Sequence, residues 1–243
     1  MSSAISIPHL TIIIPAYNES SKIETDIRAA QSFLQSQSYS IEVIVVDDGS
    51  RDATAERVRN LQPGFPQLRL ISYQPNRGKG YAVKSGVLAS RGETVLFVDA
   101  GLCVPYAEVQ KGLALLQQGW DVALGSRKIP GAEVRRPQHG YRRAGSALFG
   151  FFVRNCMGVG SVRDTQCGFK FYSARAAKEI FTRVKIDGFM FDIEAILIAR
   201  RLGLKMTEFS IEWHADHDSR FKPLTGSLRN FKELWQIRFS SYR

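Results

Sequence analysis

The stretch that decides how this chain folds is Thr94-Val95-Leu96-Phe97-Val98-Asp99, an apolar run that ends in a carboxylate. Two earlier runs have the same form. Residues 10–14 lead into Pro15-Ala16-Tyr17-Asn18-Glu19, and residues 41–46 lead into Asp47-Asp48-Gly49-Ser50. Apolar, β-branched runs of this length are typical of strands buried on both faces of a parallel sheet. Ligands of such sheets collect at the carboxyl ends of the strands, so we expect these polar segments to share one edge that holds the active site.

Helical spacing of apolar residues separates these runs. It predicts helices over residues 21–35, 50–58, 106–118, 144–157, 174–182 and 192–201, and shorter strands over 68–73, 121–124 and 205–213. A further helix is expected to open at the glycine-rich turn over 76–81 and to run through residue 89. The alternation of strand and helix predicts an α/β fold with a mostly parallel central sheet flanked by helices. Residues 128–146 and 214–224 are expected to be loops. Because there is no internal repeat or clear linker, residues 1–243 are expected to form a single domain.

Composition narrows the function classes. Hydrophobic residues make up 44% and charged residues 23%, which excludes wholesale disorder. The net charge of +10 favours an anionic partner, such as nucleic acid, a phosphorylated substrate or an anionic membrane, without choosing among them. The cysteines at 103, 156 and 167 form no Cys-x-x-Cys pair, which argues against zinc. Since no apolar stretch approaches the ~20 residues of a membrane span, we expect a cytoplasmic protein, peripheral at most.

Three segments could hold a nucleotide. A Tyr beside a Pro, as at Tyr17, can stack on a flat base, and a carboxylate such as Asp47 can accept hydrogen bonds from base or ribose. The turn Asn76-Arg77-Gly78-Lys79-Gly80 opens a predicted helix, where backbone N–H groups and the helix dipole favour phosphate. Ordinary turn chemistry also explains each segment taken alone. Nucleic acid is the weaker partner because no aromatic and basic RNA-binding signature is visible.

These segments together resemble the family 2 glycosyltransferases of the GT-A fold. Three later motifs sharpen the resemblance to polyprenyl-phosphate and dolichyl-phosphate hexosyltransferases, most of all the dolichyl-phosphate β-glucosyltransferase branch. They are Gly125-Ser126-Arg127, Asp164-Thr165-Gln166-Cys167-Gly168-Phe169-Lys170 and Phe191-Asp192-Ile193-Glu194. The resemblance runs from about residue 10 to about residue 242.

The resemblance implies an inverting transfer of a hexose to a polyprenyl- or dolichyl-type lipid phosphate. The donor would be a nucleotide-sugar, UDP-glucose-like before GDP-mannose-like. Residues about 8–127 would form the donor half and about 128–226 the acceptor half. Apolar residues among Arg and Lys over about 227–243, independently of the resemblance, predict an amphipathic basic helix. The donor would be bound by Pro15, Tyr17, Asn18, Glu19, Asp47, Asp48, Lys79, Asp99 and Arg127. Asp99, Arg127, Asp192 and Glu194 would be catalytic, and Asp164, Gln166, Ser219, Arg220 and Lys222 would meet the acceptor.

The chain departs from the family pattern at its metal motif. Asp99 matches the first carboxylate of an Asp-x-Asp pair, but Gly101 stands where the second belongs. Mg²⁺ or Mn²⁺ could still bind through Asp99, the donor phosphates and water. Alternatively, Arg127 or Lys79 could offset the diphosphate charge.

Two other functions stay open at this point. A hydroxyl acceptor would need a general base, for which Asp192 is the candidate. The missing carboxylate also permits a nucleotide-sugar-binding protein without catalysis. The C-terminal helix could lie on a membrane surface, contact a membrane partner protein, or dock on the fold itself.

Overall fold

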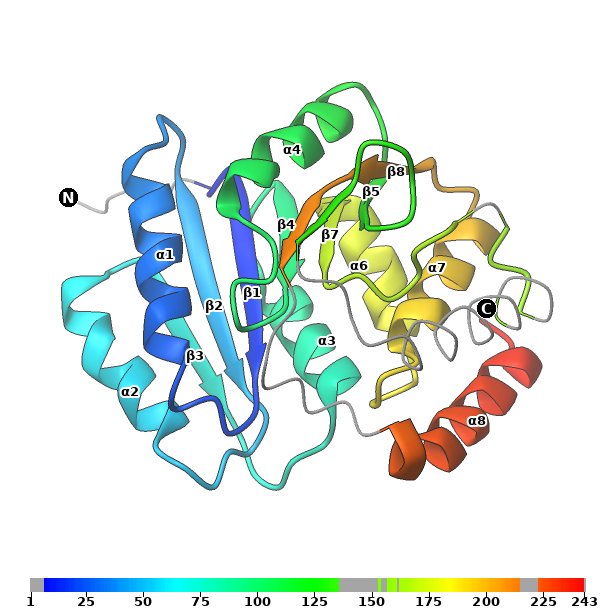
Figure 1. Ribbon diagram of the computed structural model, residues 1–243, viewed down its shortest axis with the longest axis horizontal. Helices are drawn as coiled ribbons and strands as arrows, with labels where there is room; N and C mark the ends of the chain where they lie inside the picture. The colour runs from blue at the N-terminus through cyan, green and yellow to red at the C-terminus, as the bar shows by residue number, and fades with distance from the viewer. Residues whose placement is uncertain (1–6, 136–152, 154–156, 161, 215–222, 243) are drawn as a thin grey trace.

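The computed structural model describes residues 7–135, 153, 157–160, 162–214 and 223–242 (Figure 1). Within them, a seven-stranded sheet has the order β3-β2-β1-β4-β7-β5-β8. Its strands are β1 (Leu10–Ala16), β2 (Ile41–Asp47), β3 (Leu68–Ser72), β4 (Thr94–Val98), β5 (Val122–Ser126), β7 (Phe169–Ser173) and β8 (Met206–Ser210). The pairs among β3, β2, β1 and β4 are parallel, as is the pair of β5 with β8. The predicted mostly parallel α/β fold is confirmed.

Helices cover both faces of the sheet (Figure 1). Buried residues of α1 (Ile23–Gln35), α2 (Thr54–Leu61) and α4 (Val109–Gln117) pack on the face that contains Ile12 and Ile14. Those of α3 (Lys79–Ala89), α6 (Ala174–Arg183) and α7 (Phe191–Arg201) pack on the face that contains Ile13. Because alternate residues of β1 point to opposite faces, the unbroken Ile12-Ile13-Ile14 run supplies both cores. Each such buried side chain contributes about 1.5–3 kcal/mol to folding.

Strand β7 is the strand of the central sheet that the sequence analysis missed. It runs antiparallel between β4 and β5. Its sequence, Phe-Lys-Phe-Tyr-Ser, carries a lysine at its second position, which breaks the apolar pattern of a central strand. Yet the Lys170 side chain is fully buried. Because β7 comes from the expected acceptor half and its neighbours from the donor half, the two halves share one sheet.

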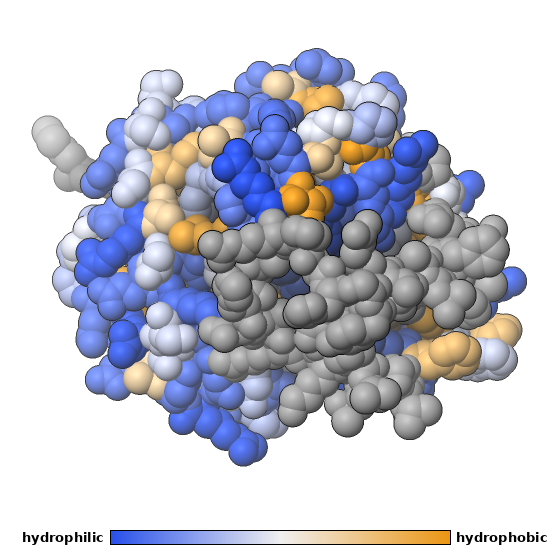
Figure 2. Space-filling model, viewed as in Figure 1, coloured by the Kyte–Doolittle hydropathy of each residue, from blue (hydrophilic) through white to orange (hydrophobic). Residues whose placement is uncertain are grey.

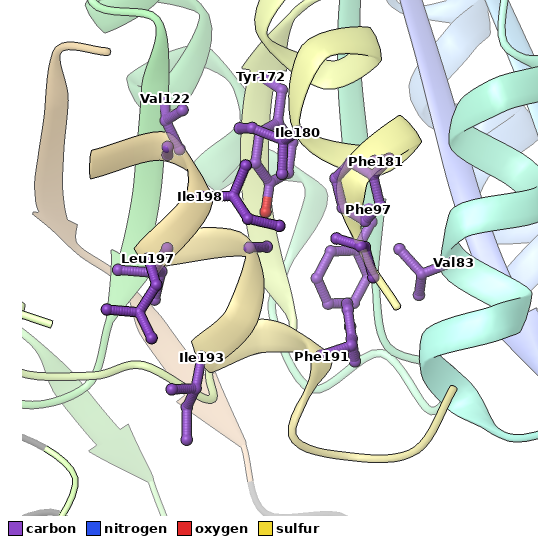
Figure 3. Close-up of a cluster of buried hydrophobic side chains, with 14 of the residues drawn as sticks. Val83, Phe97, Val122, Tyr172, Ile180, Phe181, Phe191, Ile193, Leu197 and Ile198 are labelled. Carbon is purple, nitrogen blue, oxygen red and sulfur yellow. The ribbon is translucent and has the colours of Figure 1, made fainter. Parts of the chain in front are cut away.

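The second core lies around β7. Figure 3 shows Phe97 of β4 and Tyr172 of β7 packed among side chains from α6 and α7. The rings of Phe97 and Phe191 are 5.8 Å apart, and those of Tyr172 and Phe181 are 5.4 Å apart. These contacts fix α7, whose first residues carry acidic side chains of the candidate site.

Other predicted elements differ in detail. Short 3-10 turns, η1 (Gln62–Gly64) and η2 (Tyr106–Glu108), follow α2 and precede α4. The predicted loop over 128–146 contains a strand, β6 (Glu133–Arg135), and the predicted strand over 205–213 is divided into β8 and β9 (Glu212–His214). Strands β6 and β9 form a separate two-stranded sheet. Most of the helix predicted over 144–157 and most of the loop predicted over 214–224 lie outside the described residues.

The C-terminal helix α8 spans Pro223–Phe239, beginning earlier than predicted. Leu234 and Ile237 are buried in the core shared with α3, α6 and α7. Phe231, Trp235 and Phe239 instead expose 58%, 63% and 67% of their surface. The helix therefore docks on the fold along one face and presents an aromatic face to solvent. Among the residues that the structure describes, no helix is both long and apolar enough to cross a bilayer.

Candidate active site at the carboxyl edge of the sheet

The carboxyl ends of β2, β1 and β4 lie side by side. Ala16 pairs with Asp47 across β1 and β2, and Ile13 pairs with Phe97 across β1 and β4. The polar segments after residues 16, 47 and 98 therefore meet at one edge of the sheet, as the sequence predicted. The roles of Pro15, Tyr17 and Glu19 in binding a donor stay predictions; all three are partly exposed at this edge.

The turns after β1 and β2 are joined to each other. Asn18 has a positive φ of 52°, and its backbone N–H donates to Ser50 Oγ at 2.8 Å. Its side-chain oxygen accepts from the Arg51 N–H at 2.7 Å. Asn tolerates this left-handed conformation because its short amide can bond locally. Asn18 thus holds the two turns together, whatever it contributes to a ligand.

Asp47 and Asp48 are both buried, and both organise turns. Asp47 accepts from the Ser50 N–H at 3.2 Å and from Ser72 Oγ at 2.8 Å. Asp48 accepts from Tyr73, Asn76 and the backbone of residues 77 and 78, at 2.7–2.9 Å. These four hydrogen bonds occupy the Asp48 carboxylate within the protein. Asp48 therefore sets the glycine turn that opens α3, and its predicted donor contact is untested.

The glycine turn brings Lys79 to Asp99. Gly78 has φ 121°, and a Cβ there would lie 2.4 Å from the Asp187 carbonyl oxygen, so only glycine fits. Lys79 then starts α3, and its Nζ lies 2.6 Å from Asp99 Oδ1. Burial lowers the pKa of Lys79, but attraction to Asp99 and Asp192 outweighs burial, so the pKa is raised and the ammonium stays charged.

A second ion pair lies beneath the first. Lys170 of β7 contacts Asp192 of α7 and also donates to the Cys167 carbonyl oxygen at 2.7 Å. Both charged side chains are buried, Lys170 completely. Burial raises the pKa of Asp192, although Lys170 and Lys79 oppose it. The nitrogens of Lys79 and Lys170 lie 5.5 and 5.4 Å from the Phe97 ring centre, so both ammonium groups lie near the same aromatic ring.

Arg127 is held by Asp164. The backbone N–H, Nε and one terminal nitrogen of Arg127 all donate to the Asp164 carboxylate, at 3.0, 2.7 and 2.8 Å. Asp164 is itself fixed by its own N–H, which donates to Glu208 at 2.9 Å. Burial raises the pKa of Asp164, but the hydrogen bonds and charge of Arg127 outweigh it and lower that pKa to about 2. The geometry gives Asp164 the role of positioning Arg127; contact with an acceptor is untested.

Sequence reasoning missed Asp26 entirely. This residue of α1 is 3% exposed and lines a cavity of about 10 Å³ together with Asp99. That volume is roughly the room that one water molecule needs. Both carboxylate oxygens accept from the Gly101 N–H at 3.0 Å, so Asp26 fixes the turn after Asp99. The one available signal was an acid on the apolar face of the helix, between Ile23 and Ile27.

That turn is conformationally unusual. Gly101 has φ 100° and Leu102 has φ 50°, two consecutive residues in conformations that L side chains avoid. On the other side of Asp99, a Cβ at Gly168 would lie 2.0 Å from the Asp99 carboxyl carbon. The Asp99 carboxylate is therefore confined between the Gly168 backbone and Lys79.

The remaining predicted residues either lie away from this centre or fall outside the described residues. Glu194 is fully buried, accepts from the N–H groups of Lys185 and Ile186 at 3.0 and 2.8 Å, and interacts with Tyr242. Its contacts hold the segment before α7 and the C-terminus, and its catalytic role is untested. Gln166 donates to the Phe189 carbonyl oxygen at 3.5 Å. Ser219, Arg220 and Lys222 lie outside the described residues.

The side chains here do not fit a divalent metal in the usual two-carboxylate manner. Gly101 supplies no carboxylate, Asp99 is paired with Lys79, and Asp26 accepts from Gly101. In the described part of the chain, no group of three or more His, Cys, Asp or Glu side chains is arranged to hold a metal ion. Cys103 and Cys167, the free thiols within that part, do not complete one.

Known proteins resemble this chain along most of its length. The dolichyl-phosphate β-glucosyltransferase of Homo sapiens is 32% identical, covering 94% of this chain and 74% of the human one. The enzyme of the same name from Dictyostelium discoideum is 31% identical, covering 95% and 74%. Among solved structures, glucosyl-3-phosphoglycerate synthase from Mycobacterium tuberculosis has a TM-score of 0.72 at 19% identity, covering 95% and 80%. That structure contains Mn²⁺, uridine diphosphate and glucosyl-3-phosphoglycerate.

The structural likeness identifies the fold, and the sequence likeness identifies the family. The family model for glycosyl transferase family 2 matches residues 11–181, which include the edge formed by β1, β2 and β4, the Lys79–Asp99 pair and Arg127. This chain therefore belongs to glycosyl transferase family 2.

Proposed function

We propose that this protein transfers a hexose, glucose before mannose, from a nucleotide-sugar to a polyprenyl- or dolichyl-type lipid phosphate, with inversion at the anomeric carbon. The observation that carries the proposal is the 31–32% identity to dolichyl-phosphate β-glucosyltransferases over 94–95% of the chain. The edge that gathers the Asp47 turn, Asp99, Lys79 and Arg127 supports it, because a nucleoside diphosphate needs cationic groups beside its phosphates.

The chemistry suits a phosphate acceptor. A lipid phosphate is already an anionic nucleophile at neutral pH, so it needs no general base to attack the anomeric carbon. A single displacement of the nucleoside diphosphate then inverts that carbon. The protein's work is to position the two substrates and to stabilise the negative charge that develops on the leaving diphosphate. Lys79, at the start of α3, and Arg127 are the groups we assign to that charge.

Asp99 is the one side chain that we expected to bind a metal ion. Mg²⁺ or Mn²⁺ bound to Asp99 and the donor phosphates would act as a Lewis acid on the leaving diphosphate. Its support is the Mn²⁺ in the solved neighbour. Against it stand Gly101 and the Lys79–Asp99 pair, so assays of transfer are designed with Mn²⁺ present and with it chelated.

The proposal is tested by transfer of radiolabelled sugar from UDP-glucose or GDP-mannose to polyprenyl phosphate, followed by extraction of the lipid product. Transfer from UDP-glucose to the phosphate, and none to the free polyprenol, is expected. Asp99→Asn should abolish transfer, while Glu179→Gln, on the exposed side of α6, should not change it. No lipid product from either donor, with or without Mn²⁺, would refute the proposal.

Transfer to a hydroxyl acceptor is the second candidate. Its general base would be Asp192, and Asp192→Asn would then abolish turnover while donor binding survives. The burial of Asp192 against Lys170 disfavours this role, because a base must reach the acceptor proton. Incorporation into free polyprenol or a glycan, lost in Asp192→Asn, would establish it. A fully folded protein that binds the donor but transfers to none of these acceptors would be a non-catalytic binding protein.

The acceptor lies in a membrane, and α8 offers a surface that fits one. Phe231, Trp235 and Phe239 are spaced four residues apart and are exposed, while Arg229, Lys232 and Arg238 add exposed positive charge. Figure 2 shows hydrophobic colour at the lower right of the molecule, over the position of α8 in Figure 1. Aromatic rings with basic neighbours suit an anionic interface, where each basic residue contributes about 1 kcal/mol.

Co-sedimentation with vesicles tests this surface. Binding to vesicles rich in anionic lipid, reduced by Trp235→Ser together with Phe239→Ser and by high salt, is expected. The control Tyr39→Ser, near the N-terminal end of β2, should bind normally. Equal binding of the wild type and the double variant would show that α8 meets something else, such as a membrane partner protein.

A further inference from the structure

The acids near the candidate site are engaged inside the protein. Asp99 is paired with Lys79, and Asp192 with Lys170. Asp26, which shares the cavity beside Asp99, accepts from the Gly101 backbone. The residue that would give the second metal carboxylate is a glycine. Of the described acids that line this cavity, Asp99 is therefore ion-paired and Asp26 is hydrogen-bonded within the protein.

The local charge balance does not need a divalent ion. Two carboxylates with one divalent cation sum to zero charge. One carboxylate with one ammonium, Asp99 with Lys79, also sums to zero. The pair of Asp99 with Lys79 is therefore neutral without a divalent ion.

Lys79 is also placed to act as a fixed cation. Its Nζ is 2.6 Å from Asp99 Oδ1 and 5.5 Å from the centre of the Phe97 ring. An ammonium has three N–H donors, so it can keep Asp99 and still donate to phosphate oxygens. The side chain is 20% exposed, which leaves it reachable from outside. It begins α3, where the helix dipole also favours an anion.

We infer that Lys79, and no divalent cation, carries the positive charge against the donor diphosphate in this chain, so that the protein binds the diphosphate of its donor without a metal ion. The inference rests on the proposed function for the identity of the ligand, a nucleoside diphosphate. It makes Lys79 the principal charge on that diphosphate, with Arg127 as a second cation held by Asp164.

Calorimetric titration of the purified full chain with UDP, and separately with GDP, tests the inference. The titrations are run in EDTA and again with Mn²⁺. The preferred nucleotide should bind in EDTA with a dissociation constant within about twofold of that with Mn²⁺. If that nucleotide binds only with Mn²⁺, the inference is overturned and the proposed function stands. If neither nucleotide binds under either condition, the proposed donor class fails as well.

Variants at position 79 separate charge from structure. Lys79→Gln should weaken nucleotide binding in EDTA by about tenfold or more, the loss expected of a charge-assisted hydrogen bond. Lys79→Arg, which keeps the charge, should lose less. Lys178→Gln, an exposed lysine of α6, should bind as the wild type does. Thermal unfolding midpoints confirm that each variant is folded. Unchanged nucleotide affinity in a folded Lys79→Gln protein would overturn the inference.

Discussion

Asp164→Asn should destabilise the protein through the charge that it leaves on Arg127. Asp164 is 1% exposed and Arg127 is 24% exposed, and they share two short side-chain hydrogen bonds at 2.7 and 2.8 Å. Removing one partner of a buried ion pair costs about 3–5 kcal/mol, because the other charge stays buried without compensation. Since Arg127 retains some contact with water, we expect a loss of about 3 kcal/mol in the free energy of unfolding.

The pH dependence of stability gives an independent estimate. Arg127 lowers the pKa of Asp164 from an ordinary 3.8 to about 2. A carboxylate with a lowered pKa stabilises the fold above its unfolded pKa, and the stabilisation is lost as the pH falls toward the folded pKa. The pair should therefore contribute about 2.5 kcal/mol at neutral pH that disappears between about pH 4 and pH 2.

Urea unfolding of a double-mutant cycle measures the pair directly. The cycle uses Asp164→Asn, Arg127→Gln and the double variant, from pH 7 down to pH 3. A coupling energy of about 2 kcal/mol or more is expected at pH 7. The exposed pair Glu179–Arg183, at 2.7 Å on α6, is the matched control and should couple by only about 0.3–0.5 kcal/mol. Equal coupling in the two cycles would refute the role assigned to Asp164.

Three further outcomes follow from single side chains. Gly168→Ala should lower transfer by about 100-fold or more while the protein stays folded, because its Cβ would lie 2.0 Å from the Asp99 carboxyl carbon. The control is Gly64→Ala, which has open space around its Cβ. Full activity of both variants would contradict the placement of Asp99. Burial raises the pKa of Asp26 to about 6, so ionisation of its carboxyl group opposes folding. The free energy of unfolding of the wild type, relative to that of Asp26→Asn, should fall by about 3 kcal/mol as the pH rises from 4 to 6 and stay level above pH 6. A difference in unfolding free energy that does not change between pH 4 and pH 6 would contradict the raised pKa. Burial also raises the pKa of the Cys167 thiol to about 12, so iodoacetamide should modify Cys103 in the native protein and reach Cys167 only on unfolding, as peptide mapping by mass spectrometry would reveal.

The sequence by itself determined the frame of this protein. Three apolar runs that end in polar turns predicted neighbouring strands with a common carboxyl edge. Such unbroken runs mark strands that are buried on both faces of a parallel sheet, and the crossovers between parallel strands are right-handed. Ala16 duly pairs with Asp47, and the ends of β1 and β4 adjoin. The family motifs in turn named most of the residues that gather there. Strand β7 was not predicted, because its lysine breaks the apolar pattern by which a central strand is identified.

Only the tertiary structure decided which charges face each other. Lys79 with Asp99, Lys170 with Asp192, and Arg127 with Asp164 join residues 20 to 37 positions apart, on different elements. Asp26 meets Gly101 across 75 positions. No periodicity encodes such pairs, because they depend on how whole strands and helices pack and on how much water that packing excludes. The partner of Asp99 is therefore a property of the folded chain.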